Sequence, residues 1–272
     1  MIGHRGIPGH LPEHTAESYR TAVRLGADAV ETDVVMSRDG ELVVRHEPEL
    51  SRTTDIAARP EFEGRRTTKV VDGVIVGGWF TEDLTLAELR TLHCPGPDDR
   101  ILTFDELLHV LAEEANGRPL GLHVELKHPT YFESVGLPMT AAVLDALGRH
   151  GLRQPGKGVW LQSFDEAFLR RLAPKTALPL VQLIEQGQAF SCRAIATYAD
   201  AIGPDRALVL LGDARPTGLV REAHEAGLEV FVWTLRGDVA QARRFFDAGV
   251  DGVFTDYAER ALVARDGLLE LA

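Results

Sequence analysis

Two acidic residues that lie close together in this sequence, Glu31 and Asp33, could do chemistry. They end an apolar run that predicts a β-strand, and because side chains alternate along a strand, both carboxylates project to the same side. Neighbouring carboxylates repel each other, and a bound divalent cation removes that repulsion while providing an electrophile for phosphate chemistry. Glu125, near the end of a later predicted strand, would complete the set. Oxygen ligands alone favour one Mg²⁺ or Ca²⁺ ion, with Mn²⁺ as a further choice.

Two histidines, His4 and His46, also fall at the ends of predicted extended segments. Imidazole titrates near neutral pH, so the two side chains suit a general acid and a general base, without a decision on which is which. Arg5 and Lys127 add cations that could contact the nonbridging oxygens of a phosphate. Each residue alone is more often structural, but their conjunction predicts one pocket for metal-assisted chemistry on a phosphate ester.

The elements that must position these residues alternate along the chain in the way that parallel strands joined by helices do. The strands we predict are Ile2–His4, Ala29–Val34, Leu120–Leu126, Val159–Gln162, Leu180–Ile184, Ala207–Leu211, Glu229–Thr234 and Gly252–Thr255. The helices we predict are Ala16–Leu25, Glu106–Ala115, Thr140–Gly148, Glu166–Leu172, Gly218–Ala226 and Val239–Ala248. Eight strands in this alternation predict an α/β fold, a closed TIM (β/α)8 barrel, whose active site is built at the carboxyl ends of the strands.

Local signals support several of these helices. Ser163–Glu166 and Thr103–Glu106 each fit a capping box, in which a hydroxyl and a carboxylate satisfy free amides at a helix start. Gly26, Gly227 and Gly249 each follow a helical run, where a left-handed residue can end the helix.

Residues 47–100 interrupt the alternation after the second βα region. This polar stretch contains Trp79 and Phe80, and it does not show the strand-then-helix pattern of a further barrel unit. We therefore expect one catalytic barrel domain over residues 1–272, with residues 47–100 as an insertion over the rim of the active site.

Composition limits the partners. The chain has 272 residues, and 41 acidic against 29 basic residues give a net charge of −12, which disfavours binding to nucleic acid. No run is long enough to span a membrane, so we expect no integral membrane association.

Cys94 and Cys192 are too few for a disulfide framework and predict buried thiols. The start of the chain lacks a signal pattern and predicts a cytoplasmic protein, or a secreted or periplasmic one if a signal peptide was removed. Oligomeric state stays open.

The motifs that carry these residues run in the order seen in glycerophosphodiester phosphodiesterases, and the sequence resembles the longer bacterial subgroup of that family. The matching segments are His4–Gly6, Pro12–Thr15, Gly26–Asp28, Glu31–Asp33, Asp39–Gly40, Val44–His46, Gly78–Leu86, Glu125–Phe132, Gly136–Pro138, Gln162–Phe164, Val232–Thr234 and Asp251–Asp256. Two positions depart from the pattern: Glu47 stands where Asp is usual, and Leu235–Arg236 replaces a small apolar residue and Asn.

The resemblance implies roles for the matched positions. Glu31, Asp33 and Glu125 would bind the divalent cation, His4 and His46 would move protons, and Arg5 and Lys127 would contact phosphate. Gln162, Phe164 and Trp233 match positions near the family's pocket and are expected to contact substrate. Glu13 is expected to be structural near the pocket.

The function that follows is metal-dependent hydrolysis of a small-molecule glycerophosphodiester to glycerol 3-phosphate and an alcohol, with histidine acid–base catalysis. The nucleophile could be water or the glycerol hydroxyl next to the phosphate. One alternative keeps the barrel but cleaves lysophospholipids in a phospholipase D-type reaction, in which case Trp79 and Phe80 could touch a headgroup or acyl chain. Another is a noncatalytic barrel that binds phosphate compounds.

Overall fold

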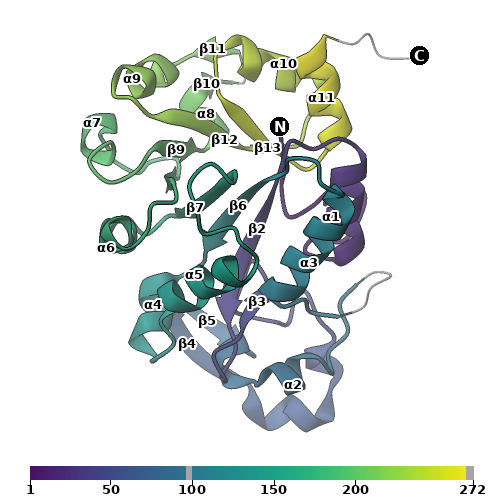
Figure 1. The fold of residues 1–272 in the computed structure, drawn as a ribbon. Helices are drawn as coiled ribbons and strands as arrows, with labels where there is room; N and C mark the ends of the chain where they lie inside the picture. Colours follow the sequence, from purple (N-terminus) through teal and green to yellow (C-terminus); the bar gives the residue numbers. More distant parts are fainter. Residues whose placement is uncertain (96–99, 213, 268–272) are drawn as a thin grey trace.

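The computed structural model describes residues 1–95, 100–212 and 214–267, and its centre is a closed barrel of eight parallel strands (Figure 1). In spatial order the strands are β1 (Ile2–Gly3), β2 (Ala29–Met36), β6 (Gly121–Leu126), β7 (Val159–Ser163), β8 (Leu180–Ile184), β9 (Ala201–Pro204), β12 (Glu229–Leu235) and β13 (Gly252–Thr255). The barrel closes because β1 pairs with both β13 and β2. The predicted TIM barrel is confirmed.

The sixth barrel strand is not the one that the sequence indicated. β9 lies at Ala201–Pro204 and pairs with β8 and β12. The predicted strand Ala207–Leu211 instead contributes to the short helix α8 (Arg206–Val209) and to β10 (Leu210–Leu211), which pairs outside the barrel with β11 (Arg215–Pro216). Glycine and proline lower the strand propensity of the true strand, so the longer apolar run beside it gave the stronger signal.

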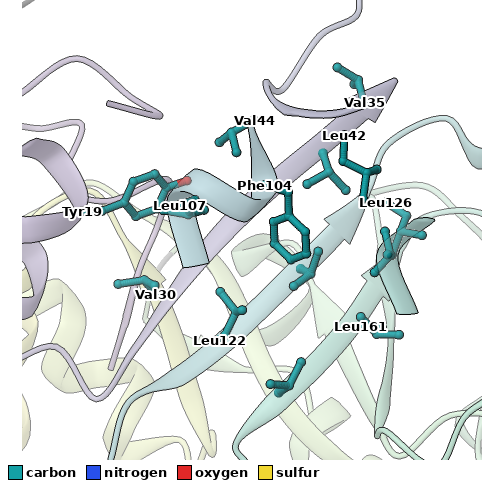
Figure 2. Packing of buried hydrophobic residues seen from close by; sticks show 14 of the residues in the cluster. Tyr19, Val30, Val35, Leu42, Val44, Phe104, Leu107, Leu122, Leu126 and Leu161 are labelled. Carbon is teal, nitrogen blue, oxygen red and sulfur yellow. The ribbon is translucent and has the colours of Figure 1, made fainter. Parts of the chain in front are cut away.

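Helices surround the barrel (Figure 1). They are α1 (Ala16–Arg24), α3 (Phe104–Ala115), α4 (Pro129–Ser134), α5 (Met139–Arg149), α6 (Glu166–Leu172), α7 (Cys192–Ile195), α9 (Leu219–Glu225), α10 (Val239–Asp247) and α11 (Ala258–Asp266). Each of the six predicted helices is present within two residues of the expected bounds. Figure 2 shows Phe104 and Leu107 of α3 in the same buried cluster as side chains of the barrel strands, among them Leu122 and Leu161.

All but one of the predicted helix-end signals are confirmed. Thr103 and Glu106 form the predicted capping box of α3, and Gly26, Gly227 and Gly249 have φ of +96°, +82° and +86°. The box predicted at Ser163 is wrong, because Ser163 is the last residue of β7. Asp165 caps α6 instead, its carboxylate accepting from the Phe168 amide at 2.8 Å.

Residues 47–100 hold a β-hairpin and short helices. These are η1 (Ile56–Ala58), η2 (Pro60–Arg65), β4 (Thr67–Val71), β5 (Val74–Gly78), η3 (Thr81–Asp83) and α2 (Leu86–Leu89); they follow β3 (Leu42–Val44), which pairs antiparallel with β2. Trp79 and Phe80 are buried, and the Trp79 indole N–H donates to the Phe62 carbonyl. They therefore cannot touch a substrate as suggested; the exposed apolar side chains of the hairpin are Val70, Val74 and Ile75.

Two smaller expectations concern cysteines and membrane spans. Cys94 and Cys192 are buried thiols outside any disulfide of the described residues, as predicted. None of the helices in the described part of the chain is long and apolar enough to cross a membrane.

Candidate active site

The three predicted carboxylates meet inside the barrel. Val30 packs outward, so Glu31 and Asp33 on β2 point inward, and β6 brings Glu125 into register with Asp33. One oxygen from each of the three residues lies within 4.8 Å of the others. Arg5, just after β1, donates its backbone N–H to Glu31 at 2.9 Å and pairs through its guanidinium with Asp33 at 3.1 Å.

Burial and neighbouring charges shift the pKa values of Glu31 and Asp33 in opposite directions. It raises the pKa of Glu31 well above its usual range, and the Asp33 charge adds to that rise. Burial also acts to raise the pKa of Asp33, but Arg5 and His46 together hold it well below the usual range. One carboxylate thus favours the anion while its neighbour resists ionising, which is the electrostatic situation that a bound cation relieves.

His4 is held by a carboxylate. Its Nδ1 lies 2.7 Å from Asp256 Oδ1, and the other oxygen of Asp256 accepts from Arg236 Nε at 2.7 Å. Burial acts to raise the pKa of Asp256, but the His4 hydrogen bond and Arg236 lower it below its usual value. An ionised Asp256 can only accept, so His4 carries its proton on Nδ1 and keeps the Nε2 lone pair. Burial lowers the pKa of His4 and favours this neutral form.

His46 has a similar partner. Its Nδ1 lies 2.7 Å from Glu47 Oε1, and that hydrogen bond lowers the pKa of Glu47 to about 2. On the other side of the ring, Lys127 Nζ lies 3.1 Å from His46 Nε2 and donates to Glu125 at 2.8 Å. Glu47, which is one methylene longer than the family's usual Asp, therefore still reaches the imidazole.

A pocket of about 170 Å³ lies over these residues. Eight of the ten predicted site residues line it: His4, Arg5, Glu31, His46, Glu125, Gln162, Phe164 and Trp233. Phe164 and Trp233 meet edge to face with ring centroids 5.5 Å apart. Of the other two, Asp33 is fully buried behind the lining, and Lys127 lines an adjacent hollow.

Several residues of the site were not identified as functional from the sequence. His14 bonds Asp33 through Nε2 at 3.0 Å, and Glu13 pairs with Arg5 at 2.9 Å, next to the cluster as expected for Glu13. Asp256 holds His4, although its segment had been noted only as a match. Arg206 and Arg236 line the pocket. Of these two arginines, Arg236 alone had been singled out in the sequence, as a departure from the family pattern.

A parallel barrel with three converging carboxylates and two carboxylate-bound histidines at the ends of its strands defines a barrel enzyme suited to chemistry on phosphate esters. Residues 4–260 match the model of the glycerophosphoryl diester phosphodiesterase family, and the chain belongs to that family. It is accordingly an enzyme, a phosphoric diester hydrolase, which confirms the resemblance and sets aside the noncatalytic alternative.

Individual relatives agree with this assignment. The chain is 30% identical to glycerophosphodiester phosphodiesterase GDPD6 of Arabidopsis thaliana, over 94% of this chain and 83% of the relative. It is 32% identical to a glycerophosphodiester phosphodiesterase of Bacillus subtilis (strain 168), over 95% and 83%. The fold matches that of an Oleispira antarctica phosphodiesterase solved with the product sn-glycerol-3-phosphate, with a TM-score of 0.76, 24% identity and coverage of 97% and 96%.

Proposed function

We propose that this protein hydrolyses glycerophosphodiesters to glycerol 3-phosphate and an alcohol, using one divalent cation and the histidines His4 and His46. The observation that carries the proposal is the convergence of the Glu31, Asp33 and Glu125 oxygens within 4.8 Å, beside two histidines that are each bonded to a carboxylate. The product bound to the Oleispira antarctica relative supports glycerol 3-phosphate as the product here.

The carboxylate cluster fits a cation. Asp33 Oδ1 is buried and has no hydrogen-bond partner, which is costly unless a ligand occupies that position. Glu31, Asp33 and Glu125 would hold the ion, and an all-oxygen donor set suits Mg²⁺ or Ca²⁺, with Mn²⁺ as a further choice. When bound, the ion would neutralise charge on the phosphate and polarise its phosphorus–oxygen bonds.

The chain's own residues would bind the phosphate and move protons. Arg5 and Lys127 place cations beside the cluster for nonbridging oxygens. One histidine would take a proton from the nucleophile, and the other would give one to the oxygen of the departing alcohol. Asp256 and Glu47 fix the ring orientation of His4 and His46 for these transfers. The nucleophile is either water or the neighbouring glycerol hydroxyl, and only the second route forms a cyclic phosphate.

We also propose that residues 1–272 act as one catalytic domain, in which residues 47–100 form an insertion beside the active site. Asp72 and Val74, at the tip of the β4–β5 hairpin, line the same hollow as Glu125 and Lys127. The insertion thus supplies part of the wall that a substrate would meet.

A lysophospholipid is the second candidate substrate, and one observation favours it. Val70, Val74 and Ile75 expose apolar side chains on the hairpin, near this hollow. Apolar side chains at the rim could contact an acyl chain.

The first experiment assays chelator-treated protein on glycerophosphocholine and lysophosphatidylcholine with Mg²⁺, Mn²⁺ or Ca²⁺ restored, resolving glycerol 3-phosphate, cyclic phosphate and free choline. We expect glycerol 3-phosphate from the first substrate only after metal is restored. Because a bound ion stabilises the fold, the same ion should raise the melting temperature, and Glu31→Gln should remove that rise. Glu113→Gln, an exposed change on α3, is the matched control. Turnover of lysophosphatidylcholine alone would support the second candidate, and metal-independent turnover would contradict the proposal.

A further inference from the structure

Two hollows meet at the candidate active site. The small hollow is the pocket of about 170 Å³ already described, and beside it lies a large hollow of about 550 Å³. The residues common to both linings are His46, Glu125, Phe164 and Trp233. A phosphodiester has two ester arms that leave phosphorus in different directions. With the phosphate at the shared residues, one arm enters each hollow.

The sizes and linings distinguish the arms. The small hollow, at about 170 Å³, has about a third of the volume of the large one, at about 550 Å³, which suits the small polyol glycerol. The small hollow also presents Gln162, Thr234 and Arg236, whose polar side chains can hydrogen-bond hydroxyl groups. The large hollow then receives the leaving alcohol.

The large hollow has an excess of negative charge. The one Lys or Arg side chain in its described lining, Lys127, bonds Glu125, and its histidines His46 and His128 are each bonded to a carboxylate, Glu47 and Asp72. Two further carboxylates in the lining, Asp165 and Glu185, have no cationic partner among the described residues. Within the part of the chain that the structure describes, the Asp165 carboxylate accepts from the Phe168 amide and the Thr130 hydroxyl alone.

The aromatic pair lies between the two hollows. Phe164 and Trp233 line both, and aromatic faces attract alkylammonium groups, most strongly where water is excluded. The Lys127 ammonium already lies over the Phe164 ring, 5.6 Å from its centroid, so Trp233 is the ring that would meet an alkylammonium group of the substrate. A carboxylate-rich wall next to aromatic rings therefore favours an alcohol that carries a positive charge over a neutral or an anionic one.

Resting on the proposed function, we propose that the large hollow binds the leaving alcohol and selects a cationic amino alcohol, with Asp165 and Glu185 as specificity-determining residues. Both carboxylates lie outside the metal-binding and proton-transfer groups, so they act on substrate choice and not on the chemical step.

The test compares kcat/KM for glycerophosphocholine, glycerophosphoglycerol and glycerophosphoserine in wild type, Glu185→Gln, Asp165→Asn and the double variant. Asparagine caps a helix as well as aspartate does, so Asp165→Asn keeps α6 intact. We expect each substitution to reduce the preference for glycerophosphocholine over glycerophosphoglycerol roughly threefold, which is the scale of a partly exposed ion pair. High salt should weaken the wild-type preference. Glu113→Gln, which removes the same charge from α3 outside both hollows, should change nothing.

The outcomes separate the two proposals. Hydrolysis of all three diesters with equal efficiency, or an unchanged preference in the double variant, would overturn the selectivity and leave the proposed function standing. Absence of hydrolysis of every diester by the metal-loaded wild type would overturn both.

Discussion

At the scale of residues, each candidate catalytic histidine has its Nδ1 bound to a carboxylate, and this contact determines which nitrogen is available for chemistry. For His4 the partner is Asp256, itself paired with Arg236. Arg236 stands at a position that departs from the family pattern, yet the structure gives it a definite contact. Its effect on His4 is indirect, through the carboxylate.

Asp256→Asn tests this arrangement. An amide can offer an N–H to the imidazole and stabilise the wrong tautomer, so we expect kcat on glycerophosphocholine to fall roughly 100-fold or more with little change in KM. Arg236→Gln leaves the carboxylate on His4 and should cost less. Steady-state kinetics, with circular dichroism to confirm folding, measure both. A folded Asp256→Asn protein with wild-type kcat would show that His4 does not depend on Asp256.

At the scale of residues, the sequence predicted which strand ends carry the site but missed two of the residues that hold it. The ten predicted site residues lie together because barrel strands place their carboxyl ends at one rim, which alternation along the chain already implied. His14 and Asp256 were missed because nothing in their local sequence shows that they reach Asp33 and His4. Those contacts join segments that only the closed barrel brings together.

At the scale of elements, α3 begins with a capping box formed by Thr103 and Glu106. The Thr103 hydroxyl accepts from the Glu106 amide at 3.1 Å, while the Glu106 carboxylate accepts from the Thr103 amide at 2.9 Å. Phe104 and Leu107, on the first turns of α3, are fully buried against the barrel. The cap therefore fixes where a core helix starts.

Thr103→Ala should lower the free energy of unfolding by about 1 kcal/mol, because it leaves a helix-start amide without its partner. Thr103→Ser keeps the hydroxyl and should retain most of the stability. Urea denaturation at constant pH measures both variants, and kcat should stay unchanged because the site lies elsewhere. Equal losses in the two variants would mean that packing of the threonine methyl group matters more than the cap.

At the scale of the whole molecule, buried histidines link the fold to pH. His123 lies inside the barrel, its ring stacked on Trp160 with centroids 5.9 Å apart. Burial lowers its pKa from 6.5 to about 3. The folded pKa is thus below the unfolded one, so this contribution to stability is complete above pH 6.5 and is lost as the pH falls from 6.5 towards 3.

We therefore expect the wild type to lose about 2 kcal/mol of stability through His123 between pH 6.5 and pH 5, at about 1.4 kcal/mol per pH unit. His123→Phe cannot be protonated and keeps an aromatic ring beside Phe231 and Phe254. The difference in unfolding free energy between wild type and variant, measured in urea at both pH values, should shift by that amount. A constant difference would mean that His123 takes up a proton as readily in the folded as in the unfolded protein, and would contradict the lowered pKa.

The sequence by itself determined the barrel, six of its helices within two residues, and the strand ends that carry the predicted site residues. Hydrophobic periodicity is a local property, and parallel strands can close in few ways. Only the tertiary structure decided which run forms the sixth strand, that Trp79 and Phe80 are buried, which groups hold His4 and Asp33, and that two hollows meet at His46. These features depend on contacts between segments that are distant in the chain. The free energy of such contacts depends on how the segments are arranged in the fold, which a local stretch of sequence does not show.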